Sequence, residues 1–429
     1  MSVIALLIVV INCVVVCLNY KKAIWLNLFL ILATPLGALT PSINTIFLLR
    51  IGPFSAYEIN IIVILIMSLI KSRFKIYRFY ILPALLMCFY LINILSSSPL
   101  YGLNSVLADA KDYIISLIII FIVSQITDED SLKRFLNIAL KAVFCSSIII
   151  FLFYIISQGT IFPTPIRYGF SIQSLYVFSI PYIIYIYGIG MCRKKWLLFS
   201  LFLQIYLMVI AQNRTNILLI ISILAIMFIY YIFVSKNMRN AIKKRLSFFG
   251  VLFLIAIIIM SIDIYQNRTI TTGFYGRINE MIFSDFSTDS TEVRSITMDY
   301  YIEEIKKNIW GYGLGKYMPA LSIYNSGFES TTLLNYGFDN MFITMSYKVG
   351  VIAAIIYLIF FVVQLFKFYL TRRKYSDNML YLIILIGLYV SCAVLTGQLL
   401  KNIGIYTFVL TLIVHINNRN IKQYERVRK

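Results

Sequence analysis

Residues 265–340 read YQNRTITTGFYGRINEMIFSDFSTDSTEVRSITMDYYIEEIKKNIWGYGLGKYMPALSIYNSGFESTTLLNYGFDN. This polar segment lies between two apolar runs, 248–264 and 341–366. It holds nine of the chain's 18 acidic residues and six of its 38 Lys and Arg, a net charge of −3 in a chain of net charge +20. In a polytopic membrane protein, a long loop without the basic excess usually faces away from the cytoplasm. We therefore expect this loop to be external and to carry the chemistry.

The composition is that of a membrane protein. Sixty per cent of the residues are hydrophobic and 13% are charged, which is well outside the range of soluble domains. The basic residues lie in short clusters between apolar runs instead of on one soluble face, so they do not indicate nucleic-acid binding. The six cysteines have no metal-ligand spacing and lie in or beside apolar segments, so we expect neither a metal site nor a disulfide framework.

The order of apolar runs predicts the topology. Thirteen runs are candidate spans, at 3–20, 24–47, 52–70, 79–97, 112–126, 136–157, 171–191, 197–211, 217–235, 248–264, 341–366, 379–397 and 403–416. Seven basic clusters hold 26 of the 38 Lys and Arg, and all fall on one side if every run spans, at 21–22, 71–78, 133–141, 193–195, 236–245, 367–374 and 419–429. That side is expected to be the cytoplasm, with the C-terminus inside and the N-terminus outside.

These runs predict an all-α, polytopic membrane bundle of about 12–14 spans, GT-C-like in character. Residues 1–264 are expected to form the N-terminal spans, 265–340 the long external loop, and 341–429 the C-terminal spans with a basic cytoplasmic tail. Shorter external connections are expected near 48–51, 98–111, 158–170, 212–216 and 398–402. Because Met1 to Tyr20 lacks a basic start and a cleavage site, we expect a first span there and no cleaved signal.

The external loop is predicted to contain an amphipathic helix at 292–308. Apolar residues recur there at steps of three and four, at Met298, Ile302, Ile305 and Ile309. Asp289 and Glu292 have the spacing of an N-cap and its capping-box partner. The helix fits either a position in the membrane interface or a structural cover over the bundle.

A glycine cluster follows the helix, as Trp310-Gly311-Tyr312-Gly313-Leu314-Gly315. It follows a helix and not a strand, so it does not match a dinucleotide-binding fingerprint. It predicts a tight bend, or a backbone that approaches a ligand closely. Gly311, Gly313, Gly315 and the adjacent Lys316, with Arg277 earlier in the loop, are candidate substrate contacts.

Two cations outside the loop are also candidates. Arg214 lies in the polar break Gln212-Asn213-Arg214-Thr215-Asn216, at the expected outer membrane edge. It is either a snorkelling side chain in a short turn or a diphosphate clamp, since guanidinium offers paired donors to phosphate. Lys348 is expected in the outer half of a span that starts near Met341, where an ionisable residue is more often functional, although snorkelling remains open.

Three features in order resemble the shared region of the O-antigen ligase and O-antigen polymerase (Wzy-type) membrane proteins. They are the Arg214 motif opening a span, Arg294 ahead of the amphipathic helix and glycine cluster, and Tyr336-Gly337-Phe338-Asp339-Asn340 leading into Lys348-Val349-Gly350-Val351-Ile352. The resemblance covers roughly 205–365.

The resemblance implies glycosyl transfer at the external or periplasmic face of a bacterial cytoplasmic membrane, without a metal, cofactor or nucleotide sugar. The implied substrate is an oligosaccharide on undecaprenyl diphosphate within membrane lipid, and a chain-length regulator is an open further partner. Arg214 and Arg294 would neutralise the diphosphate. Asn340 would bind substrate, and Asp339 stands where ligases carry a histidine that serves as base. Asp339 equally suits a helix N-cap.

The only histidine, His415, lies near the cytoplasmic end of the last run, which favours a polymerase over a ligase. A ligase-like transferase remains an alternative. A flippase for the same lipid-linked oligosaccharide would explain the span count but would not need the long loop. A purely structural membrane protein would not need the outward arginines.

Overall fold

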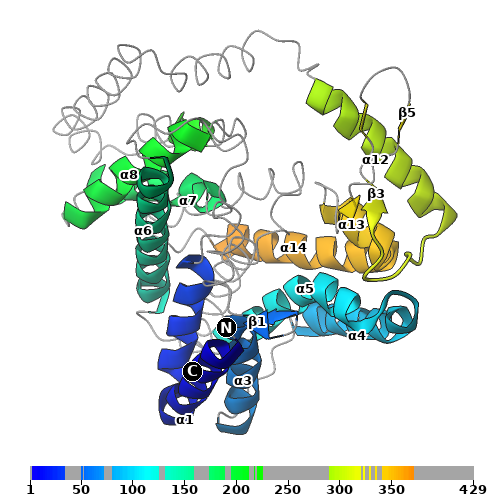
Figure 1. Ribbon diagram of the computed structural model, residues 1–429, viewed down its shortest axis with the longest axis horizontal. Helices are drawn as coiled ribbons and strands as arrows, with labels where there is room; N and C mark the ends of the chain where they lie inside the picture. Colours follow the sequence, from blue (N-terminus) through cyan, green and yellow to red (C-terminus); the bar gives the residue numbers. More distant parts are fainter. Residues whose placement is uncertain are drawn as a thin grey trace. The chain divides into compact units, whose positions relative to one another are not determined.

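The computed structural model describes residues 2–33, 50–51, 53–71, 80–124, 131–158, 173–188, 195–211, 217, 220–225, 289–319, 322–323, 328–329, 334–335 and 341–371 (Figure 1). Over these ranges the protein is all-α apart from short paired strands of two residues each. The candidates Arg214, Arg277, Asp339 and Asn340 lie outside the described residues, as do the expected spans 248–264, 379–397 and 403–416.

The chain divides into two compact units. The first combines Met1–Leu32, Leu48–Ile138 and Phe286–Lys429, so segments from both ends of the chain pack together in it. The second combines Ala33–Phe47 and Ala139–Asp285. Its described helices are most of α6 (Ser131–Gln158), α7 (Gln173–Gly188) and α8 (Lys195–Ala211), which match the apolar runs expected there. Within it the Ser147 and Tyr176 hydroxyls are 2.9 Å apart.

Helix α1 (Ser2–Ala33) contains the expected run 3–20 and the first part of the expected run 24–47, joined by a kink. The backbone leaves helical geometry at Asn19, with φ −154° and ψ 86°. The Asn19 side chain accepts a hydrogen bond from the backbone N–H of Lys22 at 3.1 Å, as a cap for the second half. Across the kink, the buried Asn12 amide donates to Asn27 Oδ1 at 3.0 Å. A polar contact between two apolar half-helices therefore holds the bend.

Helix α3 (Ala56–Lys71) begins after the hairpin of β1 (Arg50–Ile51) and β2 (Phe54–Ser55). The Ser55 backbone N–H donates to Glu58 Oε2 at 2.6 Å, which is the backbone half of a capping box. Lys111 Nζ lies 3.4 Å from Glu58 Oε1, so the same buried carboxylate also ties α3 to the next helical pair.

Helices α4 (Ile81–Tyr101) and α5 (Leu103–Ser124) are joined by one residue, Gly102. The predicted external connection at 98–111 is therefore wrong. Helix α4 continues to Tyr101 and α5 begins at Leu103, so most of these residues are helical. The physical reason is Gly102, which adopts φ 79° and donates its N–H to Ser98 O at 3.0 Å. Glycine accepts this left-handed conformation without strain and makes the turn without a loop.

The all-α part of the fold prediction is confirmed over the described residues, whereas the polytopic membrane bundle stays a prediction. Within the described residues, α4 is the one helix that is long and apolar enough to cross a membrane, judged by length and composition. Several shorter apolar helical segments of 10–17 residues accompany it. Large apolar side chains are exposed along α1 and α4, including Leu7, Ile11, Leu18, Ile92, Leu95 and Leu100.

The polar segment 265–340 contains the predicted helix as α12 (Asp289–Lys307), which begins at the expected cap residue. After the glycine cluster, β3 (Met318–Pro319) pairs with β6 (Leu334–Asn335), and β4 (Ser322–Ile323) pairs with β5 (Phe328–Glu329) between them. These nested antiparallel pairs bring the chain back toward the following helix.

The expected span at 341–366 is not one helix. It is broken into α13 (Met341–Lys348) and α14 (Val351–Thr371), so the prediction of a continuous span is wrong. The Val349 and Gly350 N–H groups both donate to Met345 O, at 2.8 and 3.1 Å, and Gly350 has φ 108°. This is a glycine-terminated helix end, after which α14 starts in a new direction and lies along α4 (Figure 1).

Candidate functional site at the outer-loop junction

The glycine cluster docks onto the break between α13 and α14. The Tyr312 N–H donates to Tyr347 O at 2.7 Å, and the Gly313 N–H donates to Lys348 O at 2.9 Å. In return, the Val351 N–H donates to Ile309 O at 2.9 Å. We use the name junction for residues Ile309–Lys316 together with the parts of α4, α5, α12, α13 and α14 that they contact.

Two glycines allow backbone to meet backbone at the junction. A Cβ on Gly311, which has φ +88°, would lie 2.6 Å from both Gly350 N and Lys348 O. A Cβ on Gly350 would lie 2.7 Å from Trp310 O. No flexible side-chain end lies there to give way, so any larger residue must displace main chain. Glycine at both positions is therefore a packing requirement.

The other two glycines face α4 and α5. A Cβ on Gly313 would lie 2.6 Å from Ser97 Oγ, and one on Gly315 would lie 3.0 Å from Val106 Cγ2. The close approach expected of this cluster is thus made to protein atoms. Substrate contact by Gly311, Gly313 or Gly315 stays a prediction.

Asn93 of α4 organises the polar contacts of the junction. Its Oδ1 accepts the Leu314 N–H at 2.8 Å and the Ser97 hydroxyl at 3.1 Å, while its Nδ2 reaches Lys348 O at 3.5 Å. The hydroxyl of Tyr101, the last residue of α4, donates to Tyr312 O at 2.9 Å. Side chains of α4 therefore satisfy loop backbone groups that would otherwise be buried without partners.

A buried ion pair lies beneath the cluster. Lys348 Nζ is 2.5 Å from Asp109 Oδ2, and the two side chains are 0% and 6% exposed. The same carboxylate oxygen accepts the Gly315 N–H at 2.9 Å. One carboxylate thus joins α5, the glycine cluster and α13. Buried charges are costly unless paired, so each partner requires the other.

Lys348 was a candidate from sequence, whereas Asp109 was not. The sequence placed Asp109 in a loop, and its partner lies 239 residues away. A usable signal existed, since an acid near one apolar run and a single lysine within another are each expensive alone. Pairing them required knowing which runs are neighbours.

Aromatic packing fixes α12 on α13. Tyr301, Ile343 and Tyr347 form a buried cluster with Met318, and Ile305 packs against it from α12. The Tyr301 and Tyr347 rings meet edge to face with centroids 5.3 Å apart. Burial raises the pKa of the Tyr301 hydroxyl well above its ordinary value, so it stays neutral. Part of the apolar face of α12 therefore packs against protein.

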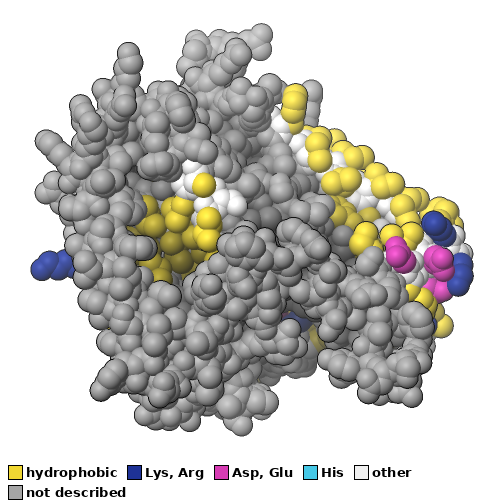
Figure 2. All heavy atoms as spheres, turned by 90° about the horizontal axis from the view of Figure 1, so that it is seen from above, with side chains coloured by type: hydrophobic (Ala, Val, Ile, Leu, Met, Phe, Trp, Pro, Cys, Tyr) yellow, Lys and Arg dark blue, Asp and Glu magenta, His cyan; other side chains and the backbone are white. Residues whose placement is uncertain are grey.

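The C-terminal end of α12 is charged and open to solvent (Figure 2). Lys307 Nζ lies 2.6 Å from Glu304 Oε1, and this hydrogen bond lowers the pKa of the Glu304 carboxyl. The Tyr312 hydroxyl donates to Glu304 Oε2 at 3.0 Å. Lys316 Nζ lies 5.9 Å from the ring centroids of both Tyr312 and Tyr101, within cation–π range.

The junction gathers five of the sequence candidates, namely Gly311, Gly313, Gly315, Lys316 and Lys348. Arg294 lies in α12, seven residues or about two turns before Tyr301, and its side chain lies outside the described ones. Helix α13 begins directly after Asp339-Asn340 in the sequence. The helix and glycine cluster that follow Arg294, and the Lys348 segment that follows Asp339-Asn340, are thus packed together.

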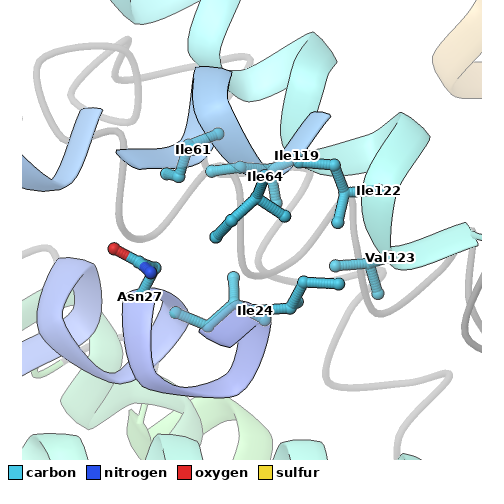
Figure 3. Close-up of a pocket in the computed structure, with 8 residues that line it drawn as sticks. Ile24, Asn27, Ile61, Ile64, Ile119, Ile122 and Val123 are labelled. Carbon is cyan, nitrogen blue, oxygen red and sulfur yellow. The ribbon is translucent and has the colours of Figure 1, made fainter. Parts of the chain in front are cut away.

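A small pocket elsewhere in the first unit is unsuited to a polar substrate (Figure 3). Its lining comes from α1, α3 and α5 and consists of Ile24, Asn27, Leu28, Ile61, Ile64, Ile119, Ile122 and Val123. The Asn27 amide already donates to Ala23 O at 2.9 Å. Among the described residues, no group of three or more His, Cys, Asp or Glu is placed to hold a metal.

Comparison with known proteins identifies no relative, since no family model, no curated protein and no solved structure matches the chain.

Proposed function

We propose that this chain is a polysaccharide polymerase of the bacterial cytoplasmic membrane, acting on O-antigen or capsule. It transfers a growing glycan from undecaprenyl diphosphate onto an undecaprenyl-diphosphate-linked repeat unit at the external face. The resemblance of residues 205–365 supports the reaction class. The observation that carries the proposal is the junction, which packs α12 and the start of α13 together.

The reaction breaks the glycosidic C–O bond to the diphosphate of the donor and forms one to an acceptor hydroxyl. The acceptor proton passes to a base, for which Asp339 is the candidate. The bond electrons leave with the diphosphate, so the developing negative charge requires cations. Arg214 and Arg294 are the candidates, because guanidinium pairs with phosphate oxygens through two parallel hydrogen bonds.

The junction bears on this reaction through geometry. Arg294 is carried by α12, and Asp339 lies two residues before the first residue of α13 in the sequence. The Tyr301–Tyr347 contact fixes these two helices against each other, and the glycine cluster ties them to α4. Transfer between two bound substrates depends on holding groups within a fraction of an ångström, so a firmly packed support is what such a site needs.

The test is a surface-glycan gel on a strain that lacks the gene, complemented with Arg214→Ala or Arg294→Ala. Both variants should reach the membrane at normal abundance and yield only single repeat units. The matched control is Arg268→Ala, from the same Gln-Asn-Arg-Thr sequence at 266–269, which should give normal long chains. Normal chain lengths in both test variants would exclude the proposed role of Arg214 and Arg294 in binding the diphosphate.

The strain without the gene separates the alternatives. A polymerase leaves single repeat units displayed at the surface. A flippase leaves repeat units in the cytoplasmic leaflet, and a ligase leaves full-length polymer on undecaprenyl diphosphate. Either of the last two results would replace the polymerase proposal.

A further inference from the structure

We propose that Ile309 and Trp310 insert into the headgroup–acyl boundary of the outer leaflet, so that the membrane surface meets this unit at the junction. The partner is the lipid bilayer itself. The inference rests on the membrane location in the proposed function, and it names where the boundary lies.

Exposure singles out these two side chains. Trp310 is 69% exposed and Ile309 is 52% exposed, although both backbones are held tightly against Gly350 and Val351. Their position is therefore fixed, while their side chains point away from the protein. A rigidly presented tryptophan beside an isoleucine is an unfavourable surface in water.

The exposed pair continues a longer apolar stripe. The hydrogen bond from Val351 N–H to Ile309 O places the pair at the first turn of α14. From there, exposed apolar side chains follow one face of α14, at Ile352, Ile355, Leu358, Ile359, Val362 and Phe366. The stripe rises about 21 Å, and Lys367 follows it in the sequence. Such a stripe, closed by a tryptophan at one end and a lysine at the other, matches a lipid-facing helix.

The chemistry beside the pair fits lipid better than a protein partner. Tryptophan is enriched at membrane interfaces because its ring is apolar and its N–H is polar. Lys306 and Lys307, one turn earlier, are exposed and suit anionic headgroups. Helix α4, which packs beside α14, has the length and composition of a membrane span.

With this placement, the outer boundary of the membrane lies at Val351, and not near Met341 as the sequence predicts. Most of α13 is buried against protein, including Met345, Tyr347 and Lys348. The Asp109–Lys348 pair then lies at the membrane surface and not within the hydrocarbon.

The experiment uses the purified full chain in vesicles of phosphatidylcholine and phosphatidylglycerol. The difference in fluorescence between the natural chain and Trp310→Phe isolates Trp310 from Trp25 and Trp196. Quenching is compared for aqueous iodide, for lipid brominated near the headgroup, and for lipid brominated near the chain end. Leu358→Trp, combined with Trp310→Phe, is the matched control in the middle of the stripe.

We expect Trp310 to lose most intensity to lipid brominated near the headgroup, and the Leu358→Trp signal to lose most to deeper bromine. Strongest quenching of Trp310 by iodide, or quenching by none of the three, overturns the inference, since the side chain then faces water or protein. If the Leu358→Trp signal is also insensitive to bromine, α14 is not in lipid and the proposed function fails with it.

Discussion

Removing one charge of the Asp109–Lys348 pair should destabilise the protein far more than removing both. Asp109→Asn keeps an oxygen for the Gly315 N–H but leaves the Lys348 ammonium without its counter-ion. Lys348→Met keeps the length of the side chain but leaves the Asp109 carboxylate alone. The double variant removes both charges and keeps the shape of the site.

The size of the effect follows from burial. At the observed 2.5 Å contact, the gross attraction is about 7 kcal/mol for an effective dielectric constant of about 20. Desolvation offsets most of it, so the pair adds little net stability. Leaving one partner unpaired should still cost about 3–5 kcal/mol, because that charge stays buried. The double variant should lie within about 1–2 kcal/mol of the natural chain, limited by the unsatisfied Asn amide.

The assay is unfolding of detergent-solubilised protein in a denaturing detergent titration, followed by far-UV circular dichroism. Trypsin cleavage after Lys316 gives a local measure, because that residue is half-buried at the junction and becomes accessible if the junction opens. Both single variants should be cleaved faster than the natural chain, and the double variant should recover.

Additive costs would refute this account. If the double variant is as unstable as the sum of the two single variants, the residues do not interact as a buried pair. Single variants that cost less than about 1 kcal/mol would show that the pair is solvated.

Other contacts of the junction give further predictions. Gly311→Ala should destabilise by about 3 kcal/mol or more, against about 1–2 for Gly102→Ala, because both have positive φ but only Gly311 meets backbone atoms; thermal unfolding in detergent compares them. Tyr301→Ala should cost about 3 kcal/mol and Tyr300→Ala under about 1, since only the first is buried, and equal losses in the same assay would contradict the aromatic cluster. Lys307→Ala should leave the thermal unfolding midpoint in detergent nearly unchanged, because the Lys307 side chain of this ion pair is largely exposed, and a clear drop in the midpoint would contradict that.

Local features of the sequence were sufficient for much of the helical architecture. Helices α3, α6, α7 and α8 match apolar runs, and α12 begins at the aspartate expected as its cap. These elements depend on periodicity and end signals within a few residues, which the sequence displays directly.

Two errors came from single glycines. Gly102 replaces an expected connection by a one-residue turn, and Gly350 divides an expected span. At Gly350 hydropathy is nearly continuous across the glycine, so the run length does not show the break. At Gly102 the polar residues of 98–111 suggested a long connection, although they continue the helices on both sides of the glycine. The deciding property is the backbone conformation, which is set by what packs against it.

The site was predictable only in part. The glycine cluster and Lys348 were candidates from residue type alone, and both lie at the junction. Asp109, Asn93 and Tyr101 were missed, because their roles arise from contacts with residues more than 200 positions away. Local patterns cannot rank such residues above other polar groups near apolar runs.

The distance along the chain between the partners at the junction has a consequence for biogenesis. Residues of α4 and α5 must wait, unpaired, while the ribosome adds more than 200 residues before Gly315 and Lys348 arrive. Closing such a long-range contact is entropically slow, so the junction should acquire its final fold late, after α13 and α14 have been made. A nascent chain released before Lys348 would hold the Asp109 carboxylate without its cation, and quality-control proteases would meet it in that state.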